Sequence, residues 1–299
     1  MNTTEPLIKQ GWLRVLIFFI GFYLFQIIGG AAIGIIIVLI KGANSTKETL
    51  DAISSADSTV LIALMVLFNF ITALLLVFIF RKFIDRRTVY SLGWNFSDNK
   101  LNAFVGLFAG IASVGAGTLI LAAMKNLRFT GWMVDGEDLI ISLGIMILVA
   151  VAEELMFRGY ILSNLMQSTN KYIALLVSAI LFGVAHLSNP NFNWLTFVNI
   201  FLAGLFLGIN YIYTQNLWYA ILLHFAWNFF QGPILGYEVS GLNFQSLLQQ
   251  ELNGNEMITG GKFGFEGSIV ATVMMIIFTL IMGIVYRRKS LNAIANIIK

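Results

Sequence analysis

The feature that most constrains this chain is a series of long apolar runs separated by short polar segments. A helix needs about 20 mainly apolar residues to cross a bilayer. Eight runs approach or exceed this length, at residues 15–40, 59–80, 101–124, 139–163, 172–187, 194–214, 217–235 and 268–286. The fifth is short and ends at Leu187-Ser188-Asn189-Pro190, a helix-stopping sequence, so we expect it to stop inside the protein. The pattern predicts an all-α, polytopic transmembrane bundle of about eight helices.

The low number of charged side chains excludes a water-soluble globule. Of the 299 residues, 58% are hydrophobic and 11% are charged, whereas soluble domains carry roughly 25% charged residues. The chain has no Cys, which excludes disulfides, thiolate metal sites and thiol nucleophiles. It shows no phosphate-binding loop, basic nucleic-acid stripe or internal repeat. We therefore expect the lipid bilayer and membrane-associated peptides or proteins as partners, and no nucleic acid.

The distribution of basic residues predicts that both termini lie inside the cell. The first apolar run is too long for a signal-peptide core of roughly 7 to 15 residues, so we expect it to be retained. With eight crossings, five basic residues fall outside: Lys41, Lys47, Lys125, Arg128 and Lys262. Twelve fall inside: Lys9, Arg14, Arg81, Lys82, Arg86, Arg87, Lys100, Lys171, Arg287, Arg288, Lys289 and Lys299. The positive-inside rule thus favours a multi-pass protein of the cell membrane, and the composition is compatible with a bacterial plasma membrane.

The order of runs and polar segments suggests three parts. Residues 1–100 hold the first two helices and a cytoplasmic loop, and residues 101–235 hold a central group of helices. Residues 236–299 hold a polar stretch and the last helix. The polar stretch, 236–267, is rich in Asn, Gln, Gly and Glu and predicts an outer loop or cap.

Three ionised side chains lie inside an apolar run, namely Glu153, Glu154 and Arg158. Each costs about 2.5 to 3.5 kcal/mol at the centre of a transmembrane helix, so they need an interior environment. Glu154 and Arg158 are four residues apart and share a helical face, which favours an ion pair. Glu153 lies about 100° round the helix and can point elsewhere. A buried salt bridge that fixes helix packing is the plain alternative, but it needs only one carboxylate.

The only two histidines of the chain also fall within or at the end of apolar runs. His224 is followed four residues later by Asn228, so both project from one helical face, and Phe182 precedes His186 by one turn. At about 1.5 Å rise per residue, these groups and Glu153 all come near the bilayer midplane. We therefore expect them to meet in one buried polar pocket.

Such a pocket supports two kinds of hydrolytic chemistry. A buried carboxylate beside an imidazole can remove a proton from water, while a second imidazole and an Asn amide can stabilise an oxyanion. The same Glu and His residues could instead bind Zn²⁺, which would activate the water. The chain lacks a His-Glu-x-x-His pattern, and Arg158 already neutralises one carboxylate, so the metal-independent version is slightly favoured.

Three motifs follow one another on successive predicted helices: Glu153-Glu154-x-x-x-Arg158, Phe182-x-x-x-His186 and His224-x-x-x-Asn228. In this order they resemble the CPBP family of intramembrane proteases, over about residues 100–235. That family includes type II CAAX prenyl endopeptidases, Abi proteins and bacteriocin self-immunity proteins. The resemblance implies that Glu153 and His186 activate the hydrolytic water and that His224 and Asn228 stabilise the oxyanion. The family is named as metalloproteases, although a metal-independent glutamate mechanism is also argued for it.

Three functions are compatible with these features. The first is an intramembrane endopeptidase, whose candidate catalytic set is Glu153, Glu154, Arg158, His186, His224 and Asn228. The second is a non-catalytic membrane scaffold or bacteriocin self-immunity protein, which would not need both Glu153 and His186. The third is a proton-coupled transporter, which also uses intramembrane Glu and His. The inverted repeats and paired broken helices typical of transporters are not evident.

Overall fold

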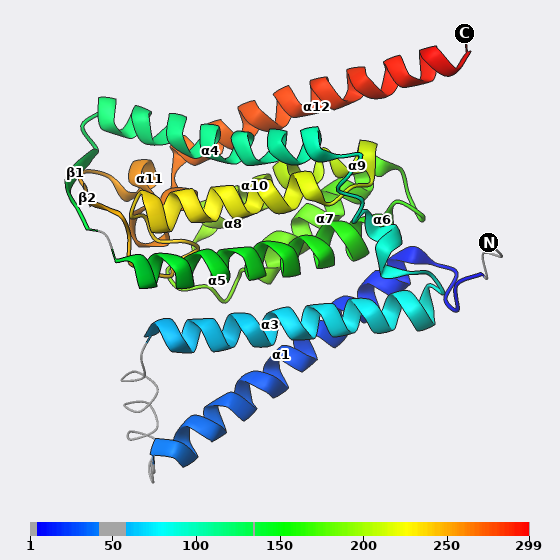
Figure 1. The fold of residues 1–299 in the computed structure, drawn as a ribbon, viewed down its shortest axis with the longest axis horizontal. Coiled ribbons are helices and arrows are strands. Elements are labelled where there is room, and N and C mark those ends of the chain that lie inside the picture. Colours follow the sequence, from blue (N-terminus) through cyan, green and yellow to red (C-terminus); the bar gives the residue numbers. More distant parts are fainter. Residues whose placement is uncertain (1–4, 42–57, 134, 299) are drawn as a thin grey trace.

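A computed structural model describes residues 5–41, 58–133 and 135–298 of the chain. The described residues fold mainly into helices that run up and down beside one another (Figure 1). The long helices are α1 (Gly11–Lys41), α3 (Ser58–Ile79), α4 (Lys100–Ala123), α5 (Gly136–Glu154), α7 (Lys171–Ala185), α8 (Trp194–Gly208), α10 (Trp218–Phe229) and α12 (Ile269–Ile298). They coincide with the eight apolar runs, so the predicted helical transmembrane fold is confirmed.

Several helices are lengthened by short segments of different winding. The π-helices η1 (Phe80–Ile84), η3 (Leu155–Leu162) and η4 (Phe230–Ile234) continue α3, α5 and α10. The helix of α5 and η3 ends in α6 (Ser163–Leu165), and α9 (Tyr211–Thr214) follows α8. The remaining short elements are the 3₁₀ turns η2 (Val89–Leu92), η5 (Gly261–Phe263) and η6 (Phe265–Gly267) and the helix α11 (Glu256–Thr259).

Six of these helical stretches are long and apolar enough to cross a membrane. They are Gly11–Ile35, Ile62–Ile84, Lys100–Ala123, Gly136–Leu165, Trp194–Thr214 and Ile269–Ala293. The protein is therefore a multi-pass membrane protein. Helix α7 has 15 residues and ends at Ala185, as expected for the short fifth run, and α10 with η4 is also shorter than a full crossing.

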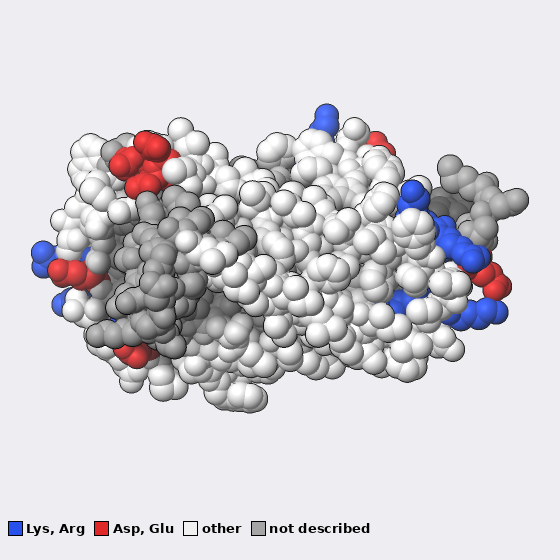
Figure 2. All heavy atoms as spheres, turned by 90° about the horizontal axis from the view of Figure 1, so that it is seen from below, with Lys and Arg blue, Asp and Glu red and all other residues white. Residues whose placement is uncertain are grey.

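Charged side chains gather toward the two ends of the bundle. Figure 2 shows a broad uncharged band between them on the face in view. The start of α1 and the end of α12 lie at the same end of the molecule (Figure 1), which fits an even number of crossings. Lys47 and Lys299, both counted in the predicted orientation, lie outside the described residues. The orientation itself stays a prediction.

Close helix packing depends on glycines at the contacts. A Cβ added at Gly106 or Gly110 of α4 would collide with the backbone of α10. On α8, Gly204 leaves no room for a Cβ against Ala179 of α7. Small residues at such positions let transmembrane helices approach closely, which is how helices pack without a hydrophobic driving force between them. These contacts hold α10 against α4 and α8 against α7.

The polar stretch 236–267 folds back onto the bundle as a cap. Its strand β2 (Leu248–Leu252) pairs antiparallel with β1 (Leu127–Trp132), which follows α4, and the register places Arg128 opposite Glu251. This two-stranded sheet was not predicted, because its segments lack a clear alternation of apolar and polar residues. The rest of the cap packs on the α7–α8 connection, where Asn191 Nδ2 donates to the Lys262 carbonyl at 3.2 Å. The cap is thus held to the bundle at two places.

Candidate active site

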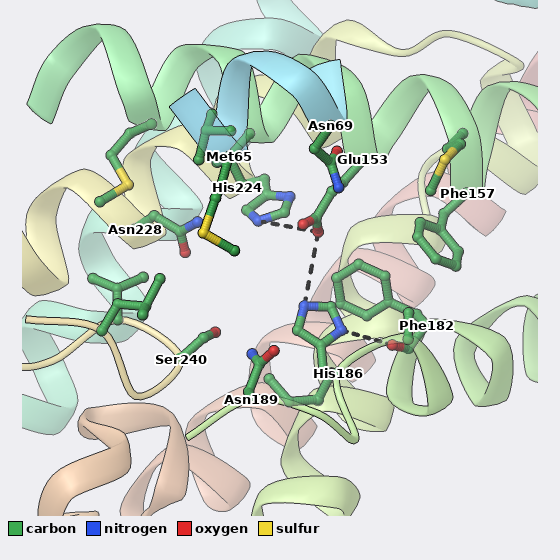
Figure 3. Close-up of a pocket in the computed structure, with 18 of the residues that line it drawn as sticks. Met65, Asn69, Glu153, Phe157, Phe182, His186, Asn189, His224, Asn228 and Ser240 are labelled. Carbon is green, nitrogen blue, oxygen red and sulfur yellow. Dashed lines mark hydrogen bonds and ion pairs between the residues drawn. The ribbon is translucent and has the colours of Figure 1, made fainter. Parts of the chain in front are cut away.

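The described residues line a partly open cavity of about 470 Å³ between the helices. Its walls come from α1, α3, α5, α7, α8, α10 and the cap. Four predicted site residues line it: Glu153, His186, His224 and Asn228. Figure 3 shows their side chains pointing into this one space from three separate helices. The expected meeting of these groups in a single pocket therefore occurs.

Local structure explains how each side chain reaches the cavity. Glu153 lies in the last turn of α5, just before the backbone widens into the π-helix η3. Such π-helical segments are frequent at functional sites. His186 follows the last residue of α7, where the chain turns before α8. His224 and Asn228 lie one turn apart on α10 and are 7% and 5% exposed.

Hydrogen bonds set the orientation of both imidazole rings. His186 Nδ1 lies 2.8 Å from the carbonyl oxygen of Phe182, and His224 Nδ1 lies 2.8 Å from Glu154 Oε1. A carbonyl or carboxylate oxygen only accepts, so Nδ1 carries the proton in each ring. In the neutral ring, Nε2 is then an acceptor, and both Nε2 atoms face Glu153 (Figure 3).

When both rings are neutral, three acceptor atoms thus converge, namely Glu153 Oε2 and the two Nε2 atoms. Glu153 Oε2 is 3.9 Å from His186 Nε2 and 4.0 Å from His224 Nε2, and it is buried without a hydrogen-bond partner. These separations are too long for direct hydrogen bonds. They come close to the roughly 4 to 4.6 Å between two atoms that bind one water molecule at about 2.8 Å. The geometry therefore suits a shared water molecule.

A zinc ion fits the same atoms less well. Tetrahedral Zn²⁺ with ligands at about 2.0 to 2.2 Å holds neighbouring ligand atoms roughly 3.4 Å apart, which is shorter than the separations between Glu153 Oε2 and the two Nε2 atoms. Among the residues that the structure describes, no group of three His, Asp or Glu side chains is arranged to hold a metal ion. The two imidazoles and the carboxylate are nonetheless groups of the type that zinc prefers.

Glu154 and Arg158 lie behind His224 and outside the cavity lining. Arg158 Nη1 donates to Glu154 Oε1 at 2.8 Å, and Arg158 Nη2 donates to the Gly204 carbonyl at 3.0 Å. The guanidinium also stacks over the Phe182 ring, 4.6 Å from its centroid. Both charged side chains are almost fully buried. The expected Glu154–Arg158 ion pair is present, and it contacts two residues of the cavity lining, His224 and Phe182.

The structure adds a third carboxylate that the sequence did not indicate. Glu266 of η6 is 5% exposed and lines the cavity from the cap. Its Oε1 accepts from Trp227 Nε1 at 3.1 Å, and its Oε2 accepts from Ser240 N at 3.1 Å and Ser240 Oγ at 2.8 Å. Burial raises the pKa of Glu266 above its ordinary value, while the hydrogen bonds from Ser240 act in the opposite direction. In the sequence it is one acid among several in a polar stretch.

Helices α1 and α3 also contribute polar side chains to the cavity. Tyr23 and Gln26 of α1 and Asn69 of α3 line it together with the catalytic candidates. A signal for them was present in the sequence, because Gln26 and Asn69 are isolated carboxamides within apolar runs. Sequence reasoning gave the first two helices no role.

Comparison with known proteins agrees with the geometry. Residues 135–230 match the family model "Type II CAAX prenyl endopeptidase Rce1-like". No curated protein and no solved structure matches the chain. The matched segment contains Glu153, His186, His224 and Asn228, but excludes α1, α3 and the cap. Residues 135–230 are therefore similar to the Rce1-like type II CAAX prenyl endopeptidase family.

Proposed function

We propose that this protein is an intramembrane endopeptidase that hydrolyses peptide bonds of membrane-associated peptides or proteins. The observation that carries the proposal is the approach of Glu153 Oε2 to the two imidazole Nε2 atoms, at 3.9 and 4.0 Å, with no hydrogen-bond partner for this oxygen among the described residues. A water molecule between these atoms would donate to the carboxylate and be held by His186. The family match of residues 135–230 supports the same activity.

The proposed reaction needs only a water molecule and the side chains of the chain. Glu153 takes one proton from the water as its oxygen bonds to the carbonyl carbon of the substrate. The carbonyl oxygen becomes an oxyanion, which accepts hydrogen bonds from the Asn228 amide and from Nε2–H of His224 in its protonated, imidazolium form. When the carbon–nitrogen bond breaks, the proton passes from Glu153 to the leaving nitrogen.

The Glu154–Arg158 pair behind the cavity supports the role of His224 as a donor to the oxyanion. A carboxylate that accepts from Nδ1–H fixes the ring orientation and stabilises the charged imidazolium. Arg158 keeps Glu154 paired on its other side. His224 can then present Nε2–H to an oxyanion, which gives the second glutamate a function that a simple salt bridge would not require.

The test is cleavage of a membrane-peptide library by the purified protein in lipid nanodiscs, with products mapped by mass spectrometry. Cleavage in H₂¹⁸O should place one ¹⁸O in the new carboxyl group. Glu153→Gln and His186→Ala should each lower the rate by roughly 10²- to 10⁴-fold or more, because the water loses its base or its holder. The exposed Glu251→Gln variant is the matched control. Near-normal turnover by purified Glu153→Gln would remove that residue as the base.

A further inference from the structure

The catalytic cavity has a second wall that lies outside the family segment. Helix α1 lines it with Phe22, Tyr23, Gln26, Gly30 and Ile33, and helix α3 lines it with Ile62, Met65, Val66, Phe68 and Asn69. The spacing of these residues corresponds to one face of each helix. Figure 3 shows Asn69 pointing into the cavity beside Glu153, on the α3 side. Whatever binds at Glu153 therefore also meets α1 and α3.

This wall is apolar except at a few positions. Gln26 is the only carboxamide in Gly11–Lys41, and Asn69 is the only one in Ser58–Ile79. An amide costs free energy in a transmembrane helix unless it is hydrogen-bonded. Both amides nevertheless lie on the narrow helical faces that line the cavity rather than on the wider faces toward lipid.

Helix packing does not explain the Gln26 side chain. Polar residues often join transmembrane helices through interhelical hydrogen bonds. Gln26 Nε2 is buried and, within the described part of the chain, donates to no partner. A buried donor left unpaired destabilises the protein, so a position that keeps one is expected to meet its acceptor in a ligand.

We infer that Gln26 and Asn69 bind the backbone of an extended peptide in the cavity that holds Glu153. The inference rests on the proposed function and identifies how the substrate is held. A peptide bond must leave its helical hydrogen bonds before it can be attacked, which exposes N–H and C=O groups in an environment with little water. A carboxamide has two donors and one acceptor, so it can pair with both kinds of group. The apolar side chains around the two amides suit apolar substrate side chains.

The experiment compares amide and ester forms of one substrate. A peptide that the wild type cleaves is made with single backbone amides, other than the scissile one, replaced by esters, which have no N–H donor and whose carbonyl oxygen accepts hydrogen bonds more weakly. At one position or more, the ester should weaken wild-type binding by roughly 2- to 12-fold, the value of one hydrogen bond. The same ester should change binding little in Gln26→Leu or Asn69→Leu, which have already lost the partner.

Two features of the experiment distinguish a failure of this inference from a failure of the proposed function. Binding is measured in a Glu153→Gln background, so that it does not depend on turnover, and kcat and KM are measured in the parent. Gln26→Leu and Asn69→Leu should raise KM more than they lower kcat. Thr72→Val, which removes a buried hydroxyl from α3 outside the cavity lining, is the control for folding. Equal ester effects in the wild type and both Leu variants would overturn the inference even where cleavage is intact. Ester effects lost in the variants would support it even where Glu153→Gln still cleaves.

Discussion

Two buried ionic clusters in this protein have a similar arrangement of charged groups but different chemical properties. In one, Glu154 lies between Arg158 and His224. In the other, Asp85 accepts from Arg14 Nη1 at 2.8 Å and from Arg81 Nη1 at 2.7 Å.

In each cluster a fully buried carboxylate joins two cationic or potentially cationic groups. The Asp85 cluster joins α1 to η1 and also reaches α6, because Asn164 Nδ2 lies 3.4 Å from Asp85 Oδ2. It thereby attaches the first two helices to the rest of the bundle.

The two clusters differ in the groups that pair with the buried carboxylate. Arg14 and Arg81 keep their charges at any physiological pH, and neither lines the cavity. His224 can gain or lose a proton and faces the cavity with its other nitrogen. A buried carboxylate with two guanidiniums therefore holds helices together, whereas a buried carboxylate with one imidazole at a cavity can serve a reaction.

The orientation of the two clusters gives the largest expected effect, an all-or-none reporter signal. The Asp85 cluster lies at the end of the bundle that is rich in basic residues, so reporters fused after Arg87 and after Lys299 should read cytoplasmic. A reporter inserted near Asn253 of the cap should read external. An external signal after Arg87 would refute the orientation with both termini inside.

Removing Arg158 from the Glu154 cluster should lower stability and activity together. Arg158→Ala leaves the Glu154 carboxylate buried with only His224 as partner. Loss of one member of a buried pair costs about 3 to 5 kcal/mol of unfolding free energy. Denaturant unfolding in detergent and peptide cleavage are the measurements, with exposed Arg128→Ala as control. Normal cleavage by a destabilised Arg158→Ala would show that the pair is structural only.

The corresponding change in the other cluster should affect stability alone. Asp85→Asn leaves two buried guanidiniums without their shared counter-charge, so the expected loss is about 3 to 5 kcal/mol. Below its unfolding temperature the variant should cleave peptide at a rate close to that of the wild type. The exposed Asp98→Asn should change neither quantity. A loss of turnover in folded Asp85→Asn would show that the Asp85 cluster also affects the reaction.

Glu266 should make the unfolding free energy depend on pH, with a smaller effect than either cluster. Its pKa is raised above the ordinary value of 4.5, so the folded state binds more protons than the unfolded state in the window just above pH 4.5. Its contribution to stability is complete below that window and is lost as pH rises through the raised pKa. Each unit of the shift is worth about 1.4 kcal/mol.

The measurement is the unfolding free energy of the wild type and of Glu266→Gln from pH 4.5 to 8. The wild type should lose stability relative to Glu266→Gln as pH rises. A difference between the two proteins that stays constant with pH would contradict the raised pKa.

The smallest expected effect is that of chelation. The separations of Glu153 Oε2 from His186 Nε2 and His224 Nε2 suit a water better than a tetrahedral zinc. Thorough chelation should leave peptide cleavage unchanged, and elemental analysis should find no stoichiometric transition metal. One zinc per chain, with activity lost on its removal and regained on its return, would assign Glu153 and the two imidazoles as ligands.

The sequence predicted the helices and the catalytic candidates because both depend on local patterns. Apolar runs of spanning length specify helices, and a charged side chain inside such a run costs free energy unless it lies in a polar interior environment. Glu153, His186 and His224 were found on this basis.

The Asp85 cluster and Glu266 were missed for the opposite reason. Asp85 follows the apolar run 59–80 in a basic segment that reads as an exposed loop, and Glu266 lies in the polar stretch. Their burial comes from distant partners such as Arg14 and Trp227, and single-sequence patterns do not contain such contacts. The strand pairing of β1 with β2 was missed in the same way.

The π-helix η3 lies along the chain between Glu154 and the part of the helix that contacts Asp85. The continuous helix of α5, η3 and α6 carries Glu154 on one side of η3 and Asn164, which contacts Asp85, after it. A π-helical turn holds more residues than an α-helical turn, so η3 sets the rotation of one part relative to the other. Deleting one residue there would turn everything that follows by about 100°. The facing directions of the two clusters are thus fixed by the number of residues between them, so a change of length in this segment would be harder to tolerate than most changes of residue.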